Sequence, residues 1–118
     1  MIKLLWLDDK RDPIDFVDKY NLHKFIDLGE IIWVKSYDEF VDYIKNFELP
    51  DTIAFDHDLG YITPETEKTG YDCAKWLVEY CMDNDLILPK WFTQSDNPAR
   101  ENINIYLKNY NKHTQKND

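Results

Sequence analysis

The chain has 118 residues, of which 43% are hydrophobic and 15% aromatic, and its formal net charge at pH 7 is −9. This length fits one compact domain, and the large aromatic side chains can fill its core without disulfide bonds or a structural metal. The acidic charge argues against binding to duplex nucleic acid, and the sequence has neither a long apolar stretch nor a signal-peptide pattern, so we expect a cytoplasmic protein that does not bind membranes.

The first half of the chain alternates between strand-like and helix-like segments. The apolar run at residues 2–7 predicts a buried strand. Residues 12–20 follow, and Pro13 suits the first turn of a helix there. The β-branched and aromatic residues at 31–37 predict a second strand, and the short apolar run at 52–55 predicts a third.

Between the second and third predicted strands, a cap and an apolar face predict a helix. Ser36 and Glu39 match a capping box. The apolar residues that share one helical face are Phe40, Tyr43, Ile44 and Phe47. Leu49 and Pro50 then end the helix.

A further predicted helix follows a polar loop that runs from Gly60 to about Lys68. Thr69 and Asp72 resemble its cap. Its apolar face comprises Tyr71, Ala74, Leu77, Val78 and Cys81. Cys73 and Cys81 are separated by about two turns of this helix, roughly 12 Å, which is too far for a disulfide bond. We therefore expect both thiols to be free and buried in the core.

Residues 90–95 predict a fourth strand, and a last helix follows it. Asn97 suits the N-cap of this helix and Pro98 its first position. Its apolar face comprises Ile103, Tyr106, Leu107 and Tyr110. Residues 111–118 have no apolar periodicity and predict a frayed polar tail, so one α/β domain is expected over residues 1–110.

Strands that alternate with helices predict a parallel sheet with both faces covered, in which ligands bind beyond the carboxyl ends of the strands. The polar residues that follow three of the predicted strands are Asp8 and Asp9, then Asp56, His57 and Asp58, and lastly Ser95, Asp96 and Asn97. Because parallel strands end at one edge of a sheet, we expect these groups to converge. Clustered carboxylates repel one another unless a cation compensates them, and carboxylate oxygens suit Mg²⁺.

Other residues add anion-binding and acid–base chemistry. The N-terminus of the last helix offers free N–H groups to an anion, and Arg100 in its first turn could hold a phosphate through two hydrogen bonds. His57, flanked by two acids, is a candidate general acid or base. Simpler interpretations stay open: Asp8 and Asp9 as caps or surface acids, Asp58 as a turn residue, and Ser95, Asp96 and Asn97 as a helix cap only.

Four motifs occur in the order typical of a known family. They are "LDDKRDP" at residues 7–13, "DHDLG" at 56–60, "TGYD" at 69–72 and "QSDNPAR" at 94–100. The acidic pair and the strand-end aspartate resemble receiver domains of response regulators, and the whole set is more similar to a divergent branch, the cyclic-phosphate processing receiver-like domains. The resemblance implies a three-layer α/β fold, receiver or flavodoxin-like (CheY-like), with about four parallel strands in the order 2-1-3-4 and no clear fifth strand.

The resemblance also implies roles for individual residues. Asp8, Asp9 and Asp56 would hold a divalent cation, Mg²⁺ or Mn²⁺. His57 and Asp58 would act together with Asp56 in catalysis. The residues implied to bind a small phosphorylated or cyclic-phosphate ligand are Arg11, Thr69, Gln94, Ser95, Asn97 and Arg100.

The chain departs from the patterns of these families at three places. Receivers usually carry a Lys at the end of a fifth strand and a Pro soon after the acceptor aspartate, and this sequence shows neither feature. Gln94 stands where the divergent branch usually has His, and Gln cannot shuttle protons. If the chemistry needs two histidines, activity is weakened or altered, whereas if His57 and a metal-bound water suffice, it survives.

The favoured hypothesis is a metal-dependent phosphoesterase that hydrolyses a cyclic phosphodiester or another nucleotide-linked phosphate. The alternative is a non-catalytic receiver-like module that binds a phosphorylated ligand or docks on a protein. Phospho-acceptance at Asp56, as in signalling receivers, ranks third, because His57 and Asp58 crowd the acceptor and the Lys is absent. The sequence predicts neither the substrate nor the oligomeric state.

Overall fold

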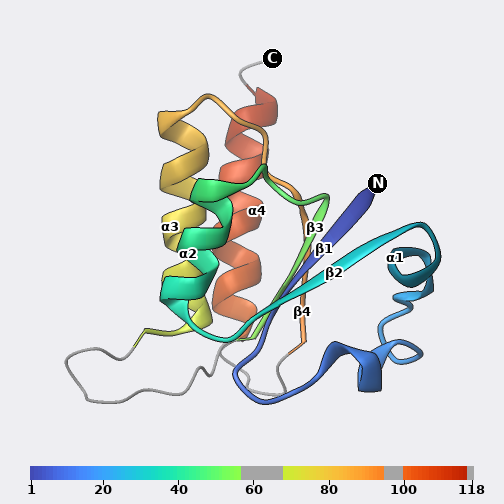
Figure 1. Ribbon diagram of the computed structural model, residues 1–118. Helices are drawn as coiled ribbons and strands as arrows, with labels where there is room; N and C mark the ends of the chain where they lie inside the picture. Colours follow the sequence, from blue (N-terminus) through green and yellow to red (C-terminus); the bar gives the residue numbers. More distant parts are fainter. Residues whose placement is uncertain (57–67, 95–99, 117–118) are drawn as a thin grey trace.

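The computed structural model describes residues 1–56, 68–94 and 100–116, except for the side chains of Arg100 and residues 112–116. At the centre of the described part lies a sheet of four parallel strands in the order β2-β1-β3-β4 (Figure 1). The strands are β1 (Ile2–Leu7), β2 (Gly29–Val34), β3 (Thr52–Phe55) and β4 (Lys90–Thr93). The parallel pairing and the strand order expected from the sequence are confirmed.

Helices cover both faces of this sheet and complete a three-layer α/β structure of the receiver type (Figure 1). The three longer helices pack on one face: α2 (Tyr37–Asn46), α3 (Gly70–Asp83) and α4 (Arg100–Lys116). The short 3-10 helix η1 (Pro13–Phe16) and α1 (His23–Leu28) lie on the other face. Within the described residues, no helix combines the length and apolar character needed to cross a membrane.

The segment predicted as one helix at residues 12–20 is instead a single 3-10 turn, and α1 begins only later in the chain. Asp12 caps this turn, because its side chain accepts a hydrogen bond from the backbone N–H of Ile14 at 3.0 Å. Pro13 stands in the first turn, as expected. The start of the segment was therefore predicted correctly, whereas its length and type were wrong.

Aromatic packing explains why no regular helix continues here. The rings of Phe16 and Tyr20 lie 5.8 and 6.0 Å from the ring of Trp6 in β1, measured between centroids. These contacts hold the segment against the sheet. Asn21 then adopts a left-handed backbone conformation with φ of 57°, which ends the segment just before α1.

Other element boundaries also differ from the sequence prediction. Strand β2 starts and ends earlier than predicted, because Ser36 already caps α2 by accepting a hydrogen bond from the N–H of Glu39. Strand β4 ends earlier as well, at Thr93. Helix α4 continues through Lys116, so most of the stretch predicted as a frayed tail, residues 111–118, is helical.

The strands bury side chains on both faces of the sheet. In β1, Leu5 and Leu7 face the layer formed by α2, α3 and α4, whereas Leu4 and Trp6 face η1 and α1. All four side chains are fully buried. Burial on both faces explains why β1 is continuously apolar instead of alternating with polar residues.

Both cysteines of α3 are free and buried, as predicted. They belong to the core between the sheet and the three longer helices. Burial raises the pKa of the Cys73 thiol well above its ordinary value of 9.0, and it raises the pKa of Cys81 to about 11. Both thiols are therefore protonated at neutral pH and act as small apolar side chains.

Candidate functional site

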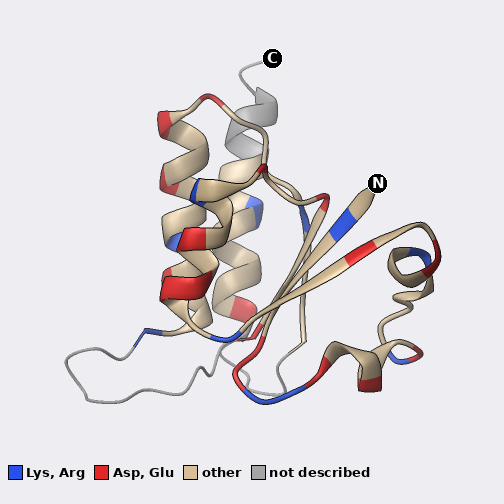
Figure 2. Ribbon diagram, viewed as in Figure 1, with Lys and Arg blue, Asp and Glu red and all other residues tan. Residues whose placement is uncertain are grey.

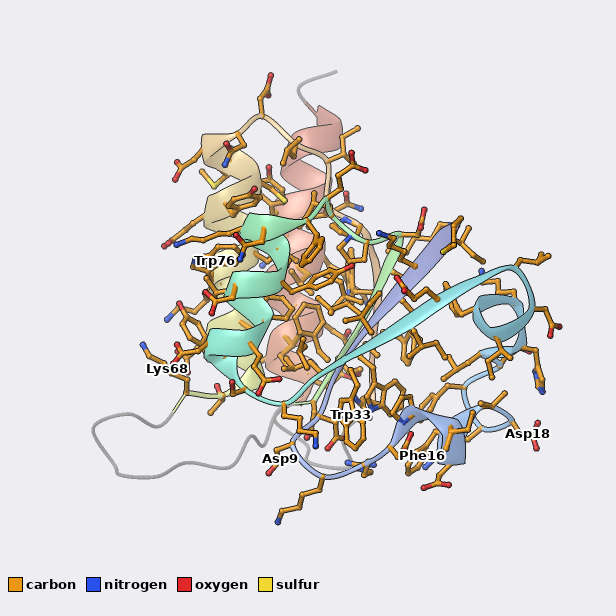
Figure 3. The ribbon with its side chains drawn as sticks, viewed as in Figure 1. Asp9, Phe16, Asp18, Trp33, Lys68 and Trp76 are labelled. Carbon is orange, nitrogen blue, oxygen red and sulfur yellow. The ribbon has the colours of Figure 1, made fainter. Side chains whose placement is uncertain are left out.

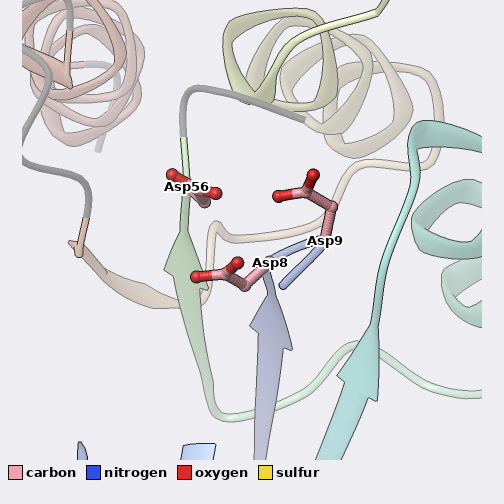
Figure 4. Close-up of side chains that lie close together, drawn as sticks. All are labelled: Asp8, Asp9 and Asp56. Carbon is pink, nitrogen blue, oxygen red and sulfur yellow. The ribbon is translucent and has the colours of Figure 1, made fainter. Parts of the chain in front are cut away.

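Three carboxylates meet beyond the carboxyl ends of β1 and β3 (Figure 4). Asp8, Asp9 and Asp56 each offer an oxygen, and these oxygens lie within 4.8 Å of one another. Strands β1 and β3 pair directly, with Trp6 opposite Ala54, so the residues that follow them reach the same edge of the sheet. Asp8 and Asp56 are almost fully buried, with 1% and 3% of their surface exposed. The structure thus brings together the three predicted metal ligands.

Asp8 is fixed by hydrogen bonds to both its side chain and its backbone. Its Oδ1 accepts from the backbone N–H groups of Lys10 and Arg11, each at 2.9 Å. Its own N–H donates to the carbonyl oxygen of Val34 at 3.0 Å, and its carbonyl oxygen accepts from Trp33 Nε1 at 2.7 Å. Figure 3 shows Trp33 and Asp9 at the same end of the sheet. These bonds preorganise the carboxylate before any ligand arrives.

Arg11 lies against the carboxylate cluster, in the loop that follows β1. In Figure 2 the ribbon of this loop shows basic residues between acidic ones. Its Nε is 3.2 Å from Asp8 Oδ2, and its Nη2 is 3.9 Å from Asp56 Oδ1. Its Nη1 donates to the backbone carbonyl of Gln94 at 3.2 Å. One guanidinium therefore reaches the ends of β1, β3 and β4.

The ion pairs of Arg11 are not well-formed hydrogen bonds. Asp8 Oδ2 accepts no hydrogen bond from the described residues, although Arg11 Nε lies 3.2 Å away, because the N–H is not directed at this oxygen. The 3.9 Å separation from Asp56 exceeds hydrogen-bonding distance. Arg11 thus offsets negative charge but leaves Asp8 Oδ2 without a hydrogen bond from the described residues.

Gln94 closes the site at the end of β4. Its side chain is fully buried, and its Nε2 donates to the carbonyl oxygen of Leu7 at 2.8 Å. Its backbone N–H donates to Phe55 O at 2.9 Å, and its carbonyl oxygen accepts from the Tyr20 hydroxyl at 3.1 Å. Gln94 Oε1 is buried and has no hydrogen-bond partner among the described residues. The amide is therefore held through its Nε2, whereas its Oε1 can still accept a hydrogen bond.

Thr69 has a structural role in the described part of the chain. Its hydroxyl accepts from the N–H of Asp72 at 3.3 Å, and its backbone N–H donates to Asp72 Oδ2 at 2.8 Å, which completes a capping box at the start of α3. The predicted cap is confirmed. Among the described residues, no contact joins Thr69 to the carboxylate cluster, and its ligand-binding role stays a prediction.

Five of the predicted site residues cannot be placed from the described side chains. His57, Asp58, Ser95 and Asn97 lie outside the described residues. Arg100 begins α4, but its side chain lies outside the described part. Their roles stay predictions. They are related to the cluster only by the sequence, in which they follow β3 or β4.

Two residues that shape the site were missed by the sequence analysis. Trp33 orients the backbone of Asp8, and the Lys35 ammonium lies 4.3 Å from the Trp33 ring centroid. Tyr20, which packs against the same core cluster as Trp33, donates to the carbonyl oxygen of Gln94. The signal available in the sequence was the polar atom on each aromatic ring, since buried indole N–H and phenol groups need a partner.

The residues present fit a hard divalent cation. The donor set consists of carboxylate oxygens, which Mg²⁺ and Mn²⁺ prefer. The buried Asp8 Oδ2 has free acceptor capacity, as does Gln94 Oε1. The formal charges are −3 for the carboxylates and +1 for Arg11, so the cluster keeps a negative charge that a divalent cation would offset.

Comparisons with known proteins relate the chain to one family and to two solved structures. The model of a family described as cyclic-phosphate processing receiver domain matches residues 3–109. A search of curated proteins finds no match. Among solved structures, a response regulator receiver domain protein from Clostridium thermocellum matches with 12% identity and a TM-score of 0.44, covering 98% of each chain. A structure described as adenylate cyclase from Rhodopirellula baltica matches with 14% identity and a TM-score of 0.44, covering 98% of this chain and 93% of that one.

Proposed function

The chain belongs to the cyclic-phosphate processing receiver domain family, and on this basis we propose that it is a metal-dependent phosphoesterase. Its substrate class is a cyclic phosphodiester or another nucleotide-linked phosphate. The observation that carries the proposal is the carboxylate cluster, in which oxygens of Asp8, Asp9 and Asp56 lie within 4.8 Å of one another. A cluster at this edge is where a parallel α/β sheet binds ligands.

In this proposal the three carboxylates hold Mg²⁺ or Mn²⁺. Such a cation supplies polarisation of the phosphoryl oxygens and a lower pKa for a bound water. The chain contributes the geometry: Asp8 is fixed by the N–H groups of Lys10 and Arg11 through one oxygen, which leaves the other oxygen for the cation. Fixed ligands reduce the reorganisation needed when the ion binds.

His57 is the proposed general acid and base. It directly follows Asp56, a proposed metal ligand, in the sequence, and this adjacency supports the role. During hydrolysis of a cyclic phosphodiester, a water oxygen bonds to phosphorus and one ring P–O bond breaks. The imidazole accepts the proton of the water and returns a proton to the leaving sugar oxygen, while Asp58 orients it.

The phosphate is proposed to sit between the cluster and the start of α4. Ser95 and Asn97, together with the free N–H groups of that helix terminus, would hold its oxygens. Arg11 and Arg100 would add charge-assisted hydrogen bonds. Arg11 already lies 3.2 Å from Asp8 Oδ2, which supports its place beside the ion.

Gln94 gives the chain its own variant of the family site. The side chain cannot transfer a proton, but its buried Oε1 can accept a hydrogen bond from a bound water or a substrate hydroxyl. The anchor between its Nε2 and Leu7 O fixes which way the amide points. Proton transfer then depends on His57 alone.

A substrate panel tests the proposal. The purified protein is incubated with Mn²⁺ and with 3′,5′-cyclic nucleotides, 2′,3′-cyclic nucleotides and a linear aryl phosphodiester, and products are separated by chromatography. We expect at least one cyclic substrate to be opened, and we expect the reaction to stop with a chelator and in Asp56→Asn. A folded protein that turns over none of these compounds would contradict the phosphoesterase.

The alternative is a non-catalytic module that binds a phosphorylated ligand. The burial and anchoring of Gln94, where the family usually has His, favours it, since this amide cannot supply a proton. Calorimetry with the same panel distinguishes the two. Tight binding that needs no Mn²⁺ and yields no product would support the module and not the enzyme.

A further inference from the structure

Arg11 holds a position that a metal-dependent site would be expected to keep free of positive charge. We propose that Arg11 is a built-in counter-cation: it competes with the divalent cation for Asp8 and Asp56, and it turns to the phosphate once the cation has bound. This inference rests on the proposed metal site and adds a regulatory role for a residue next to it. It concerns cation binding and can be tested without turnover.

The contacts of Arg11 place its charge on two of the three carboxylates. Its Nε and Nη2 lie 3.2 Å from Asp8 Oδ2 and 3.9 Å from Asp56 Oδ1. Both carboxylates are almost fully buried. Two buried negative charges without a nearby cation would be strongly unfavourable, and the guanidinium reduces this penalty when no metal is present.

The same position opposes an incoming cation. A divalent ion that contacts Asp8 and Asp56 must approach within a few ångströms of the guanidinium, where like charges repel strongly in a partly buried site. The guanidinium holds Asp8 Oδ2 only loosely, since the ion pair between them includes no hydrogen bond. Arg11 therefore weakens cation binding but remains displaceable.

The backbone of Arg11 is pinned, whereas its guanidinium is held by one hydrogen bond, from Nη1 to Gln94 O at 3.2 Å, which must break for the side chain to turn. The N–H donates to Asp8 Oδ1 at 2.9 Å, and the carbonyl oxygen accepts from Trp6 Nε1 at 2.8 Å. The side chain is 30% exposed, and its guanidinium lies 5.6 Å from the Phe16 ring centroid. A released guanidinium thus stays beside the cluster, where it can form a bidentate contact with a phosphate.

Calorimetric titration with Mn²⁺ tests the competition in three forms of the full chain: the wild type, Arg11→Gln and Lys10→Gln. Lys10 is the matched control, because it is exposed, adjacent in the same loop and equally charged, and only its backbone contacts Asp8 among the described residues. We expect Arg11→Gln to bind Mn²⁺ at least about tenfold more tightly than the wild type. Lys10→Gln should change the affinity by no more than about twofold, as a screened surface charge.

The variant Arg11→Lys and a measurement of folding with and without Mn²⁺ cover the case in which Arg11→Gln does not fold. If Arg11→Gln does not fold without metal, recovery of its folding by Mn²⁺ supports the competition. Arg11→Lys keeps the charge on a side chain that reaches fewer strand ends, and we expect it to bind Mn²⁺ more tightly than the wild type by a smaller factor. Equal or weaker Mn²⁺ binding in both Arg11 variants, or no binding in any form, overturns the proposal. Absence of turnover with these affinities as expected would count against the phosphoesterase alone.

Discussion

Gln94 Nε2 donates a hydrogen bond to the carbonyl oxygen of Leu7 at 2.8 Å, and this bond joins the ends of β4 and β1. These strands are not neighbours, because β3 lies between them in the sheet. The Gln94 backbone N–H also donates to Phe55 O in β3 at 2.9 Å. One residue therefore ties together the three strand ends around which the carboxylates gather.

Replacing Gln94 should destabilise the fold in a graded way. Gln94→Leu leaves Leu7 O buried without its donor and should lower the free energy of unfolding by about 1–3 kcal/mol. Gln94→Glu should lower it further, because a carboxylate oxygen would face the same carbonyl oxygen. Urea denaturation measures both changes.

The control for Gln94 is an exposed amide that donates to a carbonyl oxygen. Asn46 Nδ2 donates to Asp42 O at 2.8 Å on the surface of α2. Asn46→Leu should change the unfolding free energy by no more than about 0.5 kcal/mol. Similar losses in the Gln94 and Asn46 variants would contradict the structural role of Gln94.

Removing the indole N–H of Trp33 should affect both stability and cation binding. Trp33→Phe deletes the donor to Asp8 O at 2.7 Å and should lower the unfolding free energy by about 0.5–1.5 kcal/mol. We also expect a severalfold weaker affinity for Mn²⁺, because Asp8 loses part of its support. Calorimetry and urea denaturation report the two effects separately.

Trp91→Phe is the matched control for this prediction. Trp91 Nε1 donates to Asn104 Oδ1 at 3.3 Å, between β4 and α4. Its loss should reduce stability by a comparable amount and leave the Mn²⁺ affinity unchanged. Equal Mn²⁺ affinities in the Trp33 and Trp91 variants would show that the indole of Trp33 does not support the site.

Thr69→Ala separates capping from ligand binding. Because the Thr69 hydroxyl completes the capping box of α3, its removal should cost about 1 kcal/mol of unfolding free energy. Thr69→Ser should retain most of that stability. If the hydroxyl only caps the helix, affinity for inorganic phosphate is the same in all three proteins, whereas a loss in Thr69→Ala would assign it a ligand contact.

Because both cysteine thiols are buried, we expect the folded protein to lose stability at high pH. Burial raises the pKa of Cys81 from its ordinary value of 9.0 to about 11 and also raises that of Cys73. As the pH rises, the thiols of the unfolded chain ionise before those of the folded protein, and this favours unfolding. The stability is therefore unaffected by Cys81 below pH 9 and falls as the pH rises toward its folded pKa of about 11. Urea denaturation from pH 8 to 11 should show the decline, and replacing both cysteines with Ala should reduce it.

Thiol reactivity provides an independent check. Only the thiolate reacts with disulfide reagents, and both thiols are buried and protonated in the native protein. At pH 8 we expect slow reaction with an aromatic disulfide reagent in buffer and rapid reaction of both thiols in denaturant. A fast-reacting thiol in the native protein would contradict the placement of α3.

The strands were predictable because each contains a short apolar or aromatic run, and acids or a helix cap follow it. Strands β1 and β3 match their predicted bounds, and the strand-end rule predicted that Asp8, Asp9 and Asp56 would meet. The helix predicted at residues 12–20 was wrong, because the aromatic side chains of this segment pack on Trp6 and this packing outweighs the local helical pattern. Tertiary contacts of this kind are not visible in local periodicity.

The environment of Arg11 could not be derived from the sequence either. Its hydrogen bond to Gln94 joins residues 83 positions apart, and no spacing rule relates them. The motif that contains Arg11 suggested a role for it with a phosphate ligand, but not that it lies 3.2 Å from a predicted metal ligand. The contacts of Arg11 with Asp56 and Gln94 depend on how the loop after β1 folds back over the ends of β3 and β4.

We propose that Asp8, Asp9 and Asp56 together hold one divalent cation. Mn²⁺ titration of the wild type, Asp56→Asn and the exposed control Asp42→Asn measures this most directly. We predict one bound ion in the wild type and in Asp42→Asn, and an affinity lower by about tenfold or more in Asp56→Asn, because one charged ligand is lost. Equal affinities in the Asp56 and Asp42 variants, or no binding to the folded wild type, would contradict the claim.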